Sequence, residues 1–187
     1  MSPRFDILDL PLQGLKIVQR RPISDTRGYI ERMFCMEELQ PLIPGKIIVQ
    51  INHSFTGKRG TVRGMHFQNP PYAETKVVSC LIGEIFDVAV DLRRYSPTFL
   101  RWHAEILSAT NHKTMLIPEG FAHGFQTLSE NCELLYLHTA AWQPGSEGGV
   151  HAYDRRLDIR WPEAGSDLSP RDAAHPFLTA DFVGLPV

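Results

Sequence analysis

The sequence predicts an all-β protein, a double-stranded β-helix or jelly-roll barrel with a few short helices. Gly and Pro recur about every dozen residues, and short runs rich in Val, Ile and Phe lie between them. Helical signals are sparse. Such spacing favours a sandwich or barrel over βαβ units. No linker or internal repeat divides the chain, so residues 1–187 are expected to form a single domain.

The expected strands follow the apolar runs in chain order. They are 15–19, 29–34, 46–52, 61–67, 75–82, 85–92, 102–107, 114–117, 124–127 and 133–139. Within 85–92, the apolar residues from Phe86 to Leu92 alternate with the acids, so apolar and acidic side chains should lie on opposite faces. Residues 35–42 suit one or two helical turns. Ser169-Pro170 is typical of a helix start within 168–177.

Composition excludes several classes of partner. The net charge is -2, so no basic field suggests nucleic acid. No apolar run approaches the roughly 18 residues that span a bilayer, and the N-terminus does not resemble a signal peptide. Three irregularly spaced cysteines argue against a disulfide framework. These features predict a cytoplasmic protein that binds neither nucleic acid nor membrane.

The densest polar cluster is the segment from Arg63 to Gln68. On a strand, His66 and Gln68 share one face, while Met65 and Phe67 point to a core layer. Arg63 is three positions from His66, so on a regular strand their side chains point to opposite faces. A β-bulge at Gly64 would turn the Arg63 side chain to the face of His66.

A second cluster has the pattern Pro118-x-Gly120-x-x-His123, which is the centre of the second cupin motif. Metal-binding cupins also need a first motif of two histidines and a glutamate. Here that position is His66-Phe67-Gln68, so one histidine is absent. Two imidazoles without a suitably placed carboxylate make a poor binding site for a divalent metal ion. We therefore predict a cupin barrel with no metal and no other cofactor.

Two further strands carry alternating polar residues. Arg27, Tyr29 and Glu31 share one face, and Gln50 and Asn52 flank an isoleucine. A cation, an aromatic ring and a carboxylate suit a phosphorylated, planar ligand, and the amides suit sugar hydroxyls or phosphate. No nucleophile elbow, phosphate-binding loop or dinucleotide fingerprint is present. If the protein is an enzyme, these residue types favour proton transfer as its chemistry.

Together these segments resemble the dTDP-4-dehydrorhamnose 3,5-epimerase family. The blocks appear in the family's order and cover roughly residues 24–172; they are 27–31, 50–54, 63–68, 76–78, 83–93, 96–98, 117–125, 135–136, 159–162 and 168–172. The resemblance implies inversion of carbons 3 and 5 of a 4-keto-6-deoxy sugar on a nucleoside diphosphate, in deoxysugar biosynthesis. Each of these carbons lies α to the ketone, so a positioned base can remove its proton.

The resemblance also implies the roles of four catalytic residues. His66 matches the base, and Asp172 matches the carboxylate that orients it. Lys76 matches the cation that stabilises the enolate oxygen. Tyr136 matches the acid that returns a proton on the opposite face.

Nine more positions match ligand contacts of the family: Arg27, Tyr29, Glu31, Gln50, Asn52, Arg63, His123, Glu147 and Arg171. The resemblance also implies a homodimer in which the Arg27–Glu31 strand contributes to the site of the partner subunit.

Two departures leave alternatives open. Trp142 stands where the family commonly has Tyr, and Arg171 stands where it usually has Lys. A mono-epimerase, or an epimerase of another nucleotide sugar, is therefore the first alternative. A metal-dependent cupin enzyme and a non-catalytic sugar-binding cupin are further alternatives.

Overall fold

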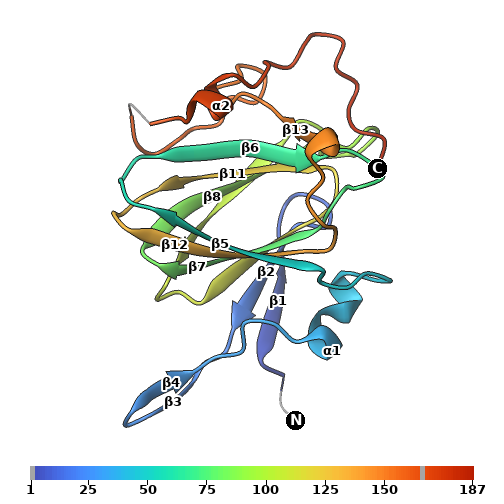
Figure 1. Cartoon of the computed structure of the whole chain (residues 1–187). Coiled ribbons are helices and arrows are strands. Elements are labelled where there is room, and N and C mark those ends of the chain that lie inside the picture. The colour runs from blue at the N-terminus through green and yellow to red at the C-terminus, as the bar shows by residue number, and fades with distance from the viewer. Residues whose placement is uncertain (1–2, 165–166) are drawn as a thin grey trace.

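The computed structural model, which describes residues 3–164 and 167–187, is built from two antiparallel sheets that face each other (Figure 1). The six-stranded sheet has, in spatial order, β1 (Phe5–Asp9), β2 (Lys16–Arg20), β10 (Lys113–Ile117), β7 (Lys76–Ile82), β12 (Cys132–His138) and β5 (Gln50–Thr56). The five-stranded sheet has β13 (Glu147–Gly149), β6 (Val62–Gln68), β11 (Phe121–Thr127), β8 (Glu84–Asp91) and β9 (Trp102–Ser108).

The remaining elements are short. β3 (Ile23–Asp25) and β4 (Gly28–Ile30) form a hairpin that extends away from the barrel (Figure 1). The helices are α1 (Met36–Leu39) and α2 (Pro170–Ala173), with single 3₁₀ turns at Gln40–Leu42 and Pro144–Ser146. With four residues in each α-helix, nothing helical in the described ranges has the length to cross a membrane. The all-β prediction is confirmed.

Four predicted elements have bounds that differ by more than one residue. The strand expected at 124–127 begins at Phe121, because β8 pairs with it as far as Asp91. The strand expected at 29–34 ends at Ile30, because Ile30 pairs with Ile23, the first residue of its partner strand β3. The strand expected at 46–52 runs instead over Gln50–Thr56, since β12, its ladder partner, ends opposite Gln50. The helix expected at 168–177 keeps only Pro170–Ala173, and Pro176 disfavours helical backbone just before it. β1, β3 and β13 were not predicted.

Apolar side chains form three clusters. One fills the barrel between the sheets around Val78 and Phe125. A second covers the outer face of the five-stranded sheet and contains Met65, with Phe67 packed against it, as predicted. The third joins α1 to the outer face of the six-stranded sheet. β8 is buried on both faces, so its acids Asp87 and Asp91 have no exposed surface.

The predicted bulge in β6 is present. His66 is opposite His123, but Arg63 is opposite Phe125, so β6 uses one residue more than β11 over the same span. Gly64 has φ +130°, and a Cβ there would lie 2.6 Å from the Cα of Gly124. Only glycine fits this close crossing. The bulge brings Arg63 to the same cavity as His66.

Candidate active site

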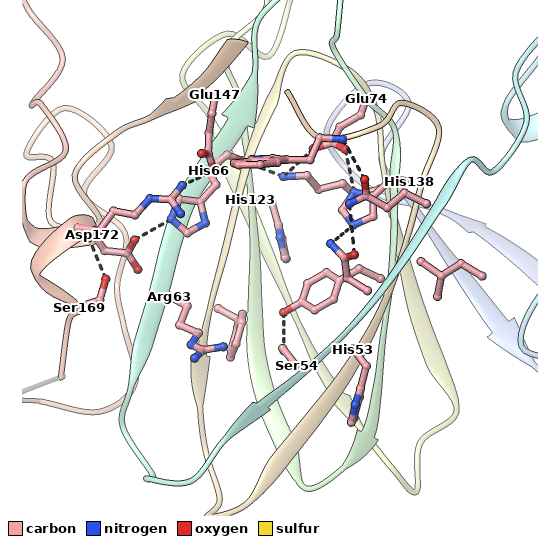
Figure 2. Close-up of a pocket in the computed structure, with 18 residues that line it drawn as sticks. His53, Ser54, Arg63, His66, Glu74, His123, His138, Glu147, Ser169 and Asp172 are labelled. Atoms are coloured by element: carbon pink, nitrogen blue, oxygen red, sulfur yellow. Dashed lines mark hydrogen bonds and ion pairs between the residues drawn. The ribbon is translucent and has the colours of Figure 1, made fainter. Parts of the chain in front are cut away.

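One end of the barrel holds a cavity of about 650 Å³, the size typical of small-molecule sites (Figure 2). It lies between β5, β6, β11 and β12, and α2 closes one side. Ten of the thirteen residues predicted from the sequence line it: Gln50, Asn52, Arg63, His66, Lys76, His123, Tyr136, Glu147, Arg171 and Asp172.

The His66–Asp172 pair lies on the wall formed by β6 and α2. Nε2 of His66 is 2.8 Å from Oδ1 of Asp172, and Oδ2 accepts a hydrogen bond from the backbone N–H of Gly64 at 3.2 Å. The Ser169 hydroxyl caps α2 by accepting from the N–H of Asp172. Burial acts to raise the pKa of Asp172, but the bonds and charge from His66 and the Gly64 N–H outweigh it, and the pKa is lowered.

His175, to which the sequence assigned no role, is a second imidazole beside this pair. Its Nε2 lies 3.9 Å from Oδ1 of Asp172, and its ring centroid is 5.4 Å from that of His66. Burial lowers the pKa of His175, and the neighbouring His66 lowers it further. The ligand atoms of the three residues lie within 4.8 Å of one another, so the predicted absence of a metal needs a direct test.

Lys76 and Tyr136 bring an ammonium and a phenol to the same cavity. Nζ of Lys76 donates to the backbone carbonyl of His66 at 3.2 Å, which holds the cation next to that residue. The Tyr136 hydroxyl is 3.3 Å from Oγ of Ser54 on β5. Burial raises the pKa of Tyr136, so its hydroxyl keeps its proton at neutral pH.

His123 forms another carboxylate pair, deeper in the barrel. Its Nε2 is 2.7 Å from Oδ1 of Asp87, whose Oδ2 has no hydrogen-bond partner among the described residues. Burial raises the pKa of Asp87, although the charge and hydrogen bond of His123 act against the rise.

The cavity mouth is polar. Arg63 and Arg171 are exposed, and Arg171 forms an ion pair with Glu147. Gln50 donates to Asn52 at 3.2 Å and accepts from the backbone N–H of Trp142 at 2.9 Å. Exposed guanidinium groups at a cavity mouth suit an anionic ligand such as a diphosphate.

Arg27, Tyr29 and Glu31 do not line this cavity. Both Arg27 and Tyr29 are exposed on the projecting hairpin, but Arg27 is in the turn between β3 and β4, and Glu31 lies beyond the end of β4. The prediction that the three share one strand face is therefore wrong. Glu31 instead accepts from Nε of Arg20 at 2.9 Å and lies 3.0 Å from Nδ1 of His112. Within one chain the three are therefore apart from the other predicted site residues, and their contribution to a partner's cavity stays a prediction.

Five polar residues that line the cavity were not assigned to the site from the sequence: His53, Ser54, Glu74, His138 and Ser169. Ser54 continues the alternation of Gln50 and Asn52, and His138 follows Tyr136 by two residues on the same strand face. Strand parity was a signal for both. Glu74 precedes β7 in a loop, where no periodicity marks it.

The barrel has a cupin-type fold, and its cavity holds an imidazole–carboxylate pair, an ammonium and a phenol, groups that are suited to proton transfer. The family model for dTDP-4-dehydrorhamnose 3,5-epimerase matches residues 9–180. The chain therefore belongs to this family of isomerases, as the motif blocks predicted.

Relatives of known activity are similar over nearly the whole chain. The dTDP-4-dehydrorhamnose 3,5-epimerase of Salmonella typhimurium is 41% identical over 92% of this chain and 94% of its own. A dTDP-6-deoxy-D-glucose-3,5-epimerase from Legionella pneumophila, solved with dTDP-4-keto-L-rhamnose, has TM-score 0.90 at 37% identity and covers 97% of each chain. A 3'-monoepimerase from Streptomyces bikiniensis, solved with dTDP-quinovose, has TM-score 0.84 at 29% identity and covers 91% of this chain and 86% of its own.

Proposed function

We propose that this protein inverts carbons 3 and 5 of dTDP-4-keto-6-deoxyglucose, in biosynthesis of a dTDP-rhamnose type of sugar. The observation that carries the proposal is the His66–Asp172 pair facing the same cavity as Tyr136 and Lys76. The Salmonella and Legionella relatives support the choice of substrate.

His66 is the proposed base. When Nε2–H donates to Asp172, Nδ1 of His66 carries the lone pair that removes a proton α to the ketone. The Asp172 carboxylate then stabilises the imidazolium that forms. Its lowered pKa keeps it ionised at neutral pH.

Lys76 and Tyr136 complete the proposed reaction. The electrons of the broken C–H bond move to the ketone oxygen, where the Lys76 ammonium stabilises the negative charge of the enolate. Tyr136 then returns a proton on the face opposite to His66, which inverts the carbon. A single group on one face would restore the original configuration.

The substrate's diphosphate is assigned to Arg63 and Arg171 at the cavity mouth. Neither is buried, so an anion reaches them without a large desolvation cost. Among the described residues Arg63 makes no ion pair, and its charge is available to the ligand. The amides of Gln50 and Asn52 are placed to bond hydroxyl groups or phosphate oxygens.

The first experiment follows carbons 3 and 5 of dTDP-4-keto-6-deoxyglucose by proton NMR in deuterium oxide. We expect both proton signals to disappear with the wild-type enzyme, and the rate to fall by at least about 100-fold in His66→Ala. Unchanged activity after chelator treatment is expected, which also tests the His66–Asp172–His175 cluster as a metal site. Absence of any exchange in the wild type would contradict the proposal.

A mono-epimerase is the second candidate, because Trp142 lines the cavity mouth without a phenolic hydroxyl and one structural relative is a 3'-monoepimerase. In this case deuterium would enter at one carbon only. Trp142→Tyr would then be expected to increase turnover at the other carbon.

We further propose a homodimer in which the β3–β4 hairpin reaches the partner's cavity. The exposed apolar residues of the hairpin and of β5 support this: Ile23, Tyr29, Ile30, Ile51 and Phe55. Such a patch on a projecting element is typical of an interface.

The dimer has a complementation test. Arg27→Ala and His66→Ala are expected to lower activity strongly when each is purified alone. Mixed after dissociation and reassociation, about half the dimers are hybrids with one intact site, so about a quarter of wild-type activity should return. No recovery would show that the hairpin does not act across the interface.

We assign the enzyme to the cytoplasm. Cys35, Cys80 and Cys132 are free thiols, which is the state that a reducing compartment maintains.

A further inference from the structure

A second histidine–carboxylate pair lines the cavity across from His66 and Asp172 (Figure 2). Nδ1 of His138, at the end of β12, is 2.7 Å from Oε2 of Glu74. The side chains of His138 and Glu74 are only 9% and 8% exposed. A pair this well buried, yet open to the cavity, is placed to act on a bound ligand rather than on solvent.

Glu74 is held as a carboxylate. Burial acts to raise its pKa, but the hydrogen bond to His138 and the charges of Lys76 and His138 outweigh burial, and the pKa is lowered. Nζ of Lys76 lies 3.4 Å from Oε1 of Glu74. The ionised carboxylate stabilises positive charge on the His138 ring when both ring nitrogens carry protons.

His138 also shares a strand face with the proposed acid Tyr136. The two residues are separated by one position on β12, and their rings are nearly parallel, at 19° with centroids 6.2 Å apart. Nε2 of His138 is 3.4 Å from Nδ2 of Asn52, another residue that lines the cavity, and it accepts from that amide N–H only while Nε2 carries no proton. The ionisable groups around His138 are thus Glu74, Lys76 and Tyr136, with the neutral Asn52 on β5.

Inversion at two carbons requires protons on the face opposite to His66 at two positions, one on each side of the ketone. The Tyr136 hydroxyl is 3.3 Å from Ser54, a contact that favours one position for it. A second donor further along the same wall would serve the other carbon.

We propose that His138, held by Glu74, is a second proton donor that serves one of the two inverted carbons, opposite to His66. This rests on the proposed epimerase function. His66 takes the proton from the carbon, and the electron pair forms the enolate. Protonated His138, whose Nε2 then no longer accepts from the Asn52 amide, gives its Nε2 proton to that carbon as the ketone re-forms. Solvent then returns a proton to His138 and takes one from His66, so both histidines recover their starting protonation states.

The test separates exchange from inversion. In His138→Gln, His66 still removes the proton and returns deuterium on the same face. Deuterium should therefore continue to enter at both carbons, while inversion at one carbon falls by about 100-fold. Inversion of both carbons at the wild-type rate, or equal loss at both, would overturn the proposal.

Glu74→Gln is the second variant, since it keeps the imidazole and removes the carboxylate. A protonated donor becomes inactive as pH rises, and without Glu74 this decline should occur at lower pH. The pH profile of the inversion rate at the affected carbon should shift to lower pH, and the pH profile at the other carbon should not shift. Profiles that shift together, or not at all, would contradict a donor role.

His103→Gln is the matched control, because His103 also pairs with a carboxylate, Glu105 at 3.0 Å, but lies on β9 away from the cavity. It should leave exchange and inversion unchanged at both carbons. A wild-type enzyme without any deuterium exchange would contradict the proposed function itself, whereas normal exchange with unaltered inversion in His138→Gln contradicts only this inference.

Discussion

The pairs His66–Asp172 and His123–Asp87 combine the same residue types at nearly the same distance, 2.8 and 2.7 Å. Their surroundings differ. The His66 side chain is 30% exposed to the cavity, and that of His123 is 6% exposed. Asp172 accepts a second hydrogen bond, from the Gly64 N–H, while Oδ2 of Asp87 has no partner in the described part of the chain.

These differences give the two carboxylates opposite pKa shifts, lowered for Asp172 and raised for Asp87. Extra donors stabilise the charge of Asp172, whereas complete burial disfavours the charge of Asp87. We infer that the first pair is suited to move a proton and that the second holds a cavity-lining imidazole in place. Residue type alone does not separate the two roles.

The largest predicted effect is that of Asp172→Asn. Without the carboxylate, His66 loses both its orientation and the stabilisation of its protonated form. We expect turnover to fall by about 100-fold or more at both carbons. Steady-state kinetics and deuterium exchange measure this, and a loss of less than about threefold would remove Asp172 from the proposed machinery.

A smaller effect is expected for His123→Gln. If this histidine only contacts the ligand, losing one hydrogen bond of about 1 kcal/mol should raise KM by about fivefold, with kcat nearly unchanged. Kinetics with varied substrate concentration separate the two constants. Complete loss of exchange at one carbon would instead show that His123 takes part in proton transfer. The two histidine–aspartate pairs would then not differ in role.

Ser169→Ala tests how α2 positions Asp172. Loss of the N-cap should lower the free energy of unfolding by about 1 kcal/mol, because the N–H of Asp172 loses its acceptor. Turnover should fall with it, since the cap holds the residue that orients His66. Ser169→Asp keeps an acceptor and should restore stability and most of the activity; equal losses in both variants would argue against a capping role.

The smallest effect is a change in the pH dependence of stability. Asp87 has a raised pKa, so it stabilises the fold at acidic pH, and this contribution is lost as pH rises from about 4 through the raised value. Asp172 has a lowered pKa, so its contribution is present above about pH 4 and is lost as pH falls through the lowered value.

Urea unfolding between about pH 3 and 8 can separate these contributions. Asp87→Asn should flatten the decrease in unfolding free energy above about pH 4, and Asp172→Asn should flatten the decrease below it. The same change of slope in both variants would show that the two carboxylates do not differ as described.

Much of the cavity follows from local patterns in the sequence. Strand parity placed His66 on the face opposite to Met65, and Gly64 marked the bulge that turns Arg63 into the cavity. The spacing of Pro118, Gly120 and His123 predicted an inward imidazole. These are properties of consecutive residues, so they can be recognised without knowing which strands pair.

Tertiary structure decided the rest. The sequence by itself determined the barrel class, the family and most cavity-lining residues, because alternation and motif spacing are local. The Glu74–His138 pair joins residues 64 positions apart, and the opposite shifts of Asp87 and Asp172 depend on burial and donors supplied by other strands. Ladder length likewise set the ends of β4 and β5. Each of these depends on which distant segments meet, and only the folded chain determines that.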